Sequence, residues 1–96
     1  MQIFINKFGR VLTSRQSGKE AYEAFLPTLD RIPDGEEVIV DFENVNTLTP
    51  SWADEFITPL EQRFGKRLRC LPSDNPSVVL TLQTLEKANG IIFTIV

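Results

Sequence analysis

Residues 36–56 read EEVIVDFENVNTLTPSWADEF, and they place a buried strand directly before a helix. Residues 37–42 are apolar or β-branched almost throughout, which is typical of a strand covered on both faces. The apolar residues that follow recur at helical spacing and predict a helix over about residues 50–64. A strand that leads into a helix in this way is the unit from which α/β folds are built.

The same alternation continues toward the C-terminus. RLRCL (residues 67–71) predicts another strand, and the PSDNP sequence that directly follows it (residues 72–76) ends it. Asn75 is suited to cap a further helix, with Pro76 at the first helical position, where a missing amide costs nothing. Gly90 is suited to end this helix in a left-handed conformation, and IIFTIV (residues 91–96) predicts a final strand.

The N-terminal residues predict an opening hairpin. QIFI (residues 2–5) alternates around Ile3 and Ile5, and the turn-forming NKFG leads to the short apolar VLT (residues 11–13). These features indicate a strand, a tight turn and a second short strand.

A helix should follow this hairpin, capped by Ser14 or Ser17, whose hydroxyls can accept from the free amides of a first turn. Because Pro27 lacks an amide hydrogen, the regular helix should kink or stop near Phe25 or Leu26. We also expect a short extra turn through Leu29.

Taken together, the elements predict a single α/β domain over residues 1–96. After the hairpin, strands and helices alternate, which favours a mixed, mostly parallel sheet of four to five strands with about three crossover helices. A chain of 96 residues can bury one modest core and leaves no room for a second domain.

Composition narrows the classes of function. The net charge of −3 gives no attraction to nucleic acid or to anionic lipid, and no apolar stretch approaches the length of a membrane span. There is no histidine, which removes the commonest general base and the Ser-His-Asp and Cys-His arrangements. The single cysteine, Cys70, and the lack of a signal peptide predict a cytoplasmic protein.

Three stretches together resemble a known family. They are FGRVLTSRQSGKEAYE (residues 8–23), the opening stretch over residues 36–56, and LPSDNPSVVLTLQTLEKA (residues 71–88). In this order they are similar to the STAS-like domain family of unknown function, and the resemblance covers about residues 8–88. The family is related to the STAS domains of anti-sigma factor antagonists, so the resemblance implies a noncatalytic regulatory module of bacterial partner-switching signalling.

In such antagonists a serine at the start of a helix is phosphorylated by a partner, a histidine-kinase-like ATPase. The resemblance therefore implies a protein partner of this kind. An ungapped match to the antagonist pattern places Pro50 at the phosphoacceptor position, with Ser51 one place later, and Trp52 where glycine is expected. Ser51 and Thr49 are the candidate phosphoacceptors, with Thr47 a lesser one.

The start of the 50–64 helix is also the candidate partner-binding surface, through Thr49, Ser51, Trp52 and Glu55. The cap has two interpretations: Thr49 with Pro50 at the first helical position, or Ser51 with Asp54 three residues later. Trp52 also has two interpretations. It shares a row with apolar residues, which indicates a core position, and tryptophan often anchors interfaces, which would place it at an exposed partner contact. We favour the core.

Three further hypotheses concern other residues. Arg15 is a candidate ligand contact in the SRQSG motif. An alternative function is a small Mg²⁺-dependent enzyme or nucleotide-binding protein that uses Asp41, Glu43 and Asp54, although we favour no cofactor and no metal, since no glycine-rich phosphate loop accompanies them. The apolar IIFTIV strand could support a homodimer if it lies at a sheet edge.

Overall fold

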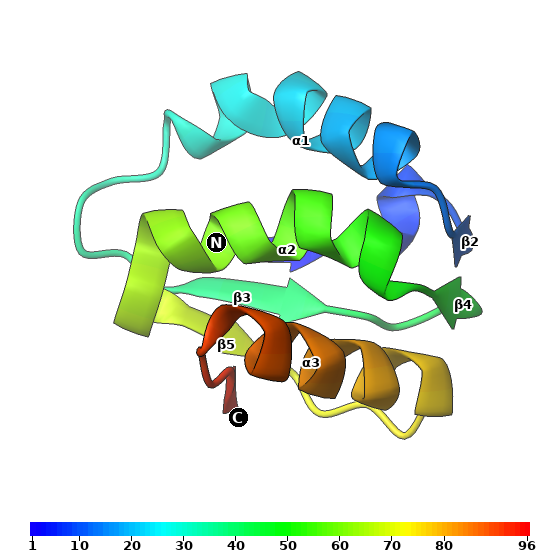
Figure 1. The fold of residues 1–96 in the computed structure, drawn as a ribbon. Coiled ribbons are helices and arrows are strands. Elements are labelled where there is room, and N and C mark those ends of the chain that lie inside the picture. The colour runs from blue at the N-terminus through cyan, green and yellow to red at the C-terminus, as the bar shows by residue number, and fades with distance from the viewer.

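Three helices lie on one face of a four-stranded sheet in the computed structural model, which describes residues 1–96 (Figure 1). The sheet order is β1-β3-β5-β6. Its strands are Gln2–Phe4 (β1), Val38–Asp41 (β3), Leu68–Cys70 (β5) and Thr94–Ile95 (β6). The helices are Arg15–Leu29 (α1), Pro50–Phe64 (α2) and Pro76–Asn89 (α3). Two short strands, Val11–Leu12 (β2) and Thr47–Leu48 (β4), form a separate sheet, and two 3₁₀ helices span Ile5–Phe8 (η1) and Gly65–Arg67 (η2).

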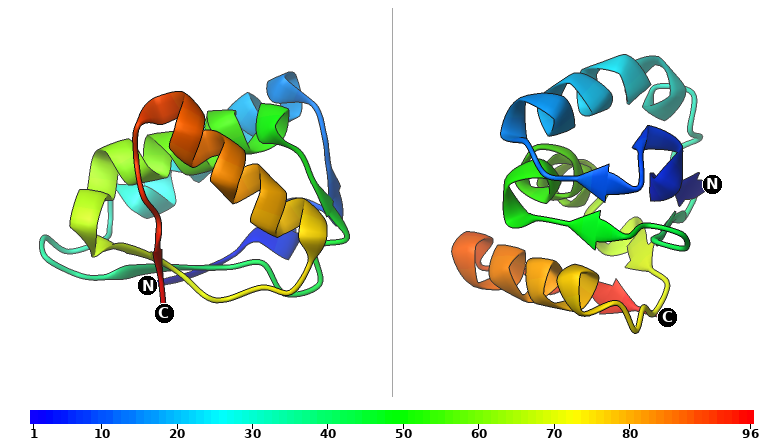
Figure 2. Two further views of the ribbon diagram at one scale, coloured as in Figure 1. Left: turned by 60° about the horizontal axis from the view of Figure 1, so that its bottom comes forward. Right: turned by 90° about the vertical axis from the view of Figure 1, so that its right-hand side faces the viewer.

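The strand order explains why the helices share one face. Each crossover, from β1 to β3 to β5 to β6, moves one place in the same direction across the sheet. Because crossovers between parallel strands are right-handed, α1, α2 and α3 all fall on the same side, as Figure 2 shows edge-on. The order never reverses, so the sheet has no switch point of the kind at which open α/β sheets bind nucleotides.

All strand pairings are parallel, which confirms a mostly parallel α/β fold and corrects one detail. The predicted opening hairpin is wrong: β1 pairs with β3, with Ile3 opposite Val40, and β2 pairs with β4, with Leu12 opposite Leu48. The NKFG segment does not form a hairpin turn. Its first three residues belong to η1, and Gly9, at φ 134°, follows the end of that 3₁₀ helix. The chain therefore leaves the main sheet after β1 and starts the second sheet at β2.

Aromatic side chains fill the space between α1, α2 and η1. The ring of Phe8 lies 5.4 Å from that of Phe25 and 4.7 Å from that of Phe56, and Trp52 stacks on Phe56 at 5.0 Å. Phe25, Trp52 and Phe56 belong to a core of 22 buried apolar residues, and the partly buried Phe8 packs against it. Edge-to-face and offset ring pairs of this kind add roughly 0.5–1.5 kcal/mol each beyond the burial of apolar area.

Helix α1 continues through Pro27 to Leu29. The predicted stop near Phe25 or Leu26 is therefore wrong, whereas the predicted turn through Leu29 is present. Pro27 is exposed, and the amide of Asp30 donates to the carbonyl of Leu26 at 2.9 Å. The helical hydrogen bonds therefore resume after Pro27, which is the residue without an amide hydrogen.

Helix α3 begins and ends where the sequence predicts. The Asn75 side chain accepts from the amide of Ser77 at 2.9 Å, Pro76 is the first helical residue, and Gly90 follows the helix at φ 64°. None of the helices is long and apolar enough to cross a membrane.

Side chains of α3 also complete the hydrogen bonding of β4. The buried Thr81 hydroxyl donates to the Leu48 carbonyl at 2.9 Å, and the Leu48 amide donates to the Ser77 hydroxyl at 3.2 Å. Buried backbone groups must be paired, and here helix side chains take the place of a neighbouring strand. This contact fixes the position of β4, and with it the start of α2.

Candidate functional site

Thr49 is the N-cap of α2. Pro50 is the first helical residue, and the Thr49 side-chain oxygen accepts from the amide of Trp52 at 3.5 Å. The same hydroxyl lies 2.9 Å from the Thr13 carbonyl, to which it can donate, and the Thr49 amide donates to Leu12 at 3.0 Å. Thr49 therefore caps the helix and ties it to the end of β2, which decides between the two cap interpretations.

Ser51 is not the cap. It is the second residue of α2, is half-buried, and its hydroxyl makes no hydrogen bond within the chain. Of the two candidate phosphoacceptors, only Ser51 has a hydroxyl free of structural contacts. Thr47, the lesser candidate, donates its hydroxyl to Asn46 at 2.9 Å.

Trp52 belongs to the core, as favoured from the sequence. Its side chain is 0% exposed, stacks on Phe56 and lies against Phe8. The interpretation of Trp52 as an exposed partner anchor is therefore wrong, because its ring cannot touch a molecule at the surface. The indole Nε1 has no hydrogen-bond partner.

Gly18 brings the first turns of α1 and α2 into contact. A Cβ atom at Gly18 would lie 3.1 Å from the Cα of Trp52 and closer still to its carbonyl oxygen. A helix start alone does not require glycine at this position, and the structure gives Gly18 a packing role. The signal in the sequence was the glycine itself, since glycine within a helix costs about 1 kcal/mol relative to alanine and usually has a reason.

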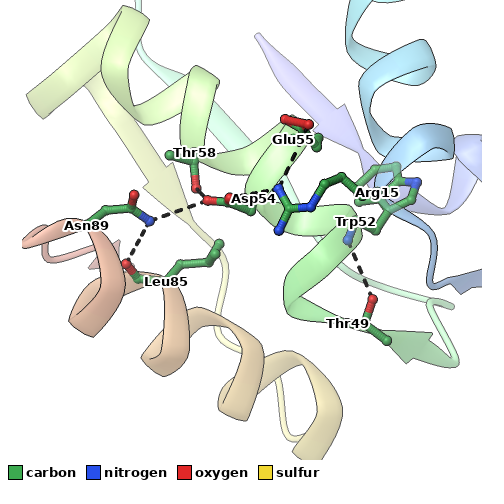
Figure 3. A network of polar contacts seen from close by, with 8 residues as sticks. All are labelled: Arg15, Thr49, Trp52, Asp54, Glu55, Thr58, Leu85 and Asn89. Carbon is green, nitrogen blue, oxygen red and sulfur yellow. Dashed lines mark hydrogen bonds and ion pairs between the residues drawn. The ribbon is translucent and has the colours of Figure 1, made fainter.

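Arg15 and Asp54 link the two helices at their N-terminal turns (Figure 3). The Arg15 guanidinium lies 3.0 Å from Asp54 and 3.8 Å from Glu55. Asp54 also accepts from the hydroxyl of Thr58 at 3.0 Å and from the side-chain amide of Asn89, at the end of α3, at 3.5 Å. One carboxylate thus joins all three helices.

These contacts change the acidity of Asp54. The hydrogen bond from Arg15 holds the pKa of the Asp54 carboxyl below its ordinary value, with smaller contributions from Thr58 and Asn89, while partial burial acts in the opposite direction. The side chains of Asp54 and Glu55 are 34% and 30% exposed, and that of Arg15 is 55% exposed. We call the surface formed by Arg15, Ser51, Asp54 and Glu55 the α1–α2 N-terminal surface.

The three carboxylates of the alternative enzyme hypothesis do not come together. Asp41, at the end of β3, is 8% exposed and accepts from the side chain of Gln2 and the amide of Glu43, each at 2.9 Å. Asp54 is instead bonded to helix residues, and no group of three such side chains could hold a metal ion. Asp41 and Glu43 do line an open hollow of about 780 Å³ at the ends of β3 and β5, but Asp41 acts there as a cap.

The fold and this surface define a class of protein: a small α/β domain with helices on one face of a parallel sheet and a capped helix start exposed beside β2 and β4. The model of one family, described as a STAS-like domain of unknown function (DUF4325), matches residues 17–77. Because this match covers more than half of the chain, the protein belongs to the STAS-like domain family. The comparison with curated proteins and the comparison with solved structures found no match.

The matched residues contain Gly18, β3, the capped start of α2 and the residues that lead into α3. The family suspected from the sequence is thereby confirmed. Arg15 lies outside the matched residues, so its role rests on the contacts with Asp54 and Glu55.

Proposed function

We propose that this chain is a noncatalytic regulatory module that binds another protein through the α1–α2 N-terminal surface. One observation carries the proposal: the packing of Gly18 on Trp52 aligns two helix starts, so that Arg15, Ser51 and Glu55 share one accessible surface. Charged side chains arranged around two helix ends favour recognition of a partner of complementary charge.

The proposed surface differs from the one expected from sequence. Ser51 and Glu55 are kept from the expected surface, and Arg15 and Asp54 are added to it. Thr49 contributes only as the helix cap, and the buried Trp52 is not part of the surface. The partner is a protein, since a net charge of −3 favours neither nucleic acid nor anionic lipid. The single cysteine, Cys70, is unpaired, which supports a cytoplasmic location.

Phosphorylation of Ser51 is the regulation that the surface supports best. Ser51 is one helical turn before Asp54 and Glu55, so a phosphate on Ser51 would meet two negative side chains and compete with them for Arg15. Modification of Thr49 would instead break the helix cap and the link to β2. By the relation of the family to anti-sigma factor antagonists, we propose a histidine-kinase-like ATPase as the partner that phosphorylates Ser51.

Variants with matched charge changes test the binding surface. Wild type, Glu55→Lys and Asp34→Lys are each used to recover partners from the native cell, and the affinity of any recovered partner is then measured. Asp34 is an exposed residue in the turn before β3. Figure 1 shows this turn at the end of the sheet opposite the start of α2. The proposal requires that Glu55→Lys weakens binding at least tenfold while Asp34→Lys does not, and equal affinities would show that the partner binds elsewhere.

The proposed regulation has a separate test. The chain is incubated with a histidine-kinase-like ATPase and ATP, and modified residues are located by mass spectrometry. We expect phosphate on Ser51 in wild type and none in Ser51→Ala. Phosphate on another residue, or none, would overturn the proposed phosphorylation but leave the binding surface to its own test.

A further inference from the structure

β6 forms one edge of the main sheet and has an unpaired side. The amide of Val96 donates to the carbonyl of Cys70 at 2.9 Å, so Val96 directs its polar groups toward β5. Because successive residues of a strand direct these groups to opposite sides, the N–H and C=O of Ile95 point outward to the free edge. They are the groups that a further strand would bond.

The edge also lacks the features that usually prevent such pairing. No charged residue and no proline occurs between Ile91 and Val96, whereas β1, the opposite edge, runs directly into η1 and its Lys7. The side chains of Ile92, Ile95 and Val96 are 86%, 53% and 48% exposed. Free strand edges are normally protected by charge, proline or a covering element, and apolar exposure of this kind marks a contact surface.

A groove of about 250 Å³ lies beside this edge, between α3 and the ends of β5 and β6. Most of its lining is apolar and includes Val79, Leu82, Phe93 and Ile95. Ile95 faces the helices because it lies in register with the buried Cys70. If another strand paired with β6, the side chain opposite Ile95 on that strand would point to the same face and would enter the groove.

Charge indicates what the neighbouring strand belongs to. Between Asn75 and Val96 the only charged residues are Glu86 and Lys87, and the Glu86 carboxylate already accepts from the amide of Phe93 at 2.8 Å. Most charged groups, and hence the net negative charge, lie outside this segment. The α3–β6 surface, defined by Val79, Gln83, Ile92 and Ile95, can therefore meet its own copy without the like-charge repulsion that other faces would bring.

We propose that a second copy of this chain docks on the α3–β6 surface, with the two β6 strands antiparallel about a two-fold axis beside Ile95. Each Ile95 then exchanges both backbone hydrogen bonds with Ile95 of the copy, and the two sheets become continuous. The side chains of both residues pack between the two α3 helices and cover the grooves. The α1–α2 N-terminal surface takes no part, so this inference does not depend on the proposed function.

Oligomeric state provides the first test, by light scattering after size exclusion and by sedimentation equilibrium up to millimolar concentration. We expect wild type to be a dimer and Ile95→Lys to be a monomer that keeps the wild-type circular dichroism spectrum. Val11→Lys is the matched control, because Val11 is an exposed apolar residue, 63% exposed, on the edge of the other sheet. A monomeric wild type, or a dimer that survives Ile95→Lys, would overturn the proposal; in the monomeric case the edge would remain available to an extended segment of another protein.

Cross-linking tests the register. The Cα atoms of a hydrogen-bonded antiparallel pair lie about 5.5 Å apart, within the range that a disulfide spans. Ile95→Cys, treated with oxidised glutathione, should therefore form a covalent dimer, while Val11→Cys should not. Cys70 is buried and does not interfere. Should the two variants cross-link to the same small extent, the proposed two-fold contact at Ile95 is wrong.

Discussion

Gly18 and Trp52 meet through their backbones: a Cβ on Gly18 would lie 3.1 Å from the Trp52 Cα and closer still to the Trp52 carbonyl oxygen. The obstacle is the main chain of α2, which a rotamer change cannot move. This contact sets the distance between the two helix starts. It thereby places Arg15 of α1 within reach of Asp54 and Glu55 of α2.

Gly18→Ala should destabilise the fold by about 1–3 kcal/mol, the usual cost of forcing extra atoms into a packed site. Alanine favours a helix by about 1 kcal/mol over glycine, so the sign of the effect separates packing from helix propensity. The measurement is urea unfolding followed by circular dichroism. Ser17→Ala, at an exposed neighbouring position, is the control and should change the free energy of unfolding little. A Gly18→Ala variant as stable as wild type would contradict the close contact.

The helices and most strands could be predicted because their signals are local. Asn75 with Pro76 and Gly90 marked the ends of α3 correctly, since caps act within one turn. The hairpin prediction failed because the choice between a hairpin and two parallel pairings depends on Val40 and Leu48, which are distant in sequence from the strands they join. Nothing in residues 2–13 contains that information.

The candidate site shows the same limit. Thr49 and Ser51 each satisfied a local capping pattern, and the choice followed from the contact of Thr49 with the end of β2. The link from Arg15 to Asp54 spans two helices, so no spacing rule could predict it. Trp52 could be assigned to the core because its row of apolar neighbours is itself a local pattern.

Asp54 should stabilise the fold at neutral pH more than in acid. Its pKa is lowered from 3.8 in the folded chain, first by the hydrogen bond from Arg15. A lowered carboxyl pKa contributes stability that is present above the unfolded value and is lost as the pH falls through the folded value. Both side chains are partly exposed, so the contribution should be less than about 1 kcal/mol.

To test the role of Asp54, the free energy of unfolding is measured for wild type and for Asp54→Asn at a series of pH values from 7 to below 3.8. The quantity of interest is the difference between the two proteins at each pH. We expect this difference to shrink as the pH falls. Asp34→Asn, in an exposed turn, is the matched control for the loss of one carboxylate. A difference that grows toward acid pH would mean that the carboxylate is not stabilised in its charged form.

Cys70 should be inert in the folded chain. Burial raises the pKa of its thiol to about 12, with a smaller effect of Glu86, and the thiolate is the reactive form. At pH 8 a thiol reagent should therefore modify Cys70 only after denaturant is added. Rapid modification without denaturant would show that β5 opens readily.

The same shift predicts how Cys70 affects stability at high pH. Because its folded pKa lies above the unfolded value of 9.0, deprotonation favours the unfolded chain, and stability should fall as the pH rises above 9. Cys70→Val removes the titrating group, so its free energy of unfolding should decline less over the same range. Equal declines would assign the effect to other residues.

Trp52→Phe should cost less than Trp52→Ala. The indole Nε1 has no partner, so phenylalanine removes no hydrogen bond and keeps part of the stacking on Phe56, which lies 5.0 Å away. Alanine leaves a cavity, at a typical cost of about 3–5 kcal/mol. Urea unfolding of both variants gives the comparison, and equal costs would mean that a phenylalanine ring keeps none of the packing that the indole makes.

Trp52 also reports directly on the corrected surface, because it is the only tryptophan and is 0% exposed. Its fluorescence in the folded chain should be shifted to short wavelength and resist quenching by iodide. Unfolding in urea should reverse both properties and serves as the positive control. Since the indole lies beneath the α1–α2 N-terminal surface, iodide should quench it no more in the free chain than in a partner complex. Strong quenching in the free folded chain, relieved when a partner binds, would instead place Trp52 at the interface.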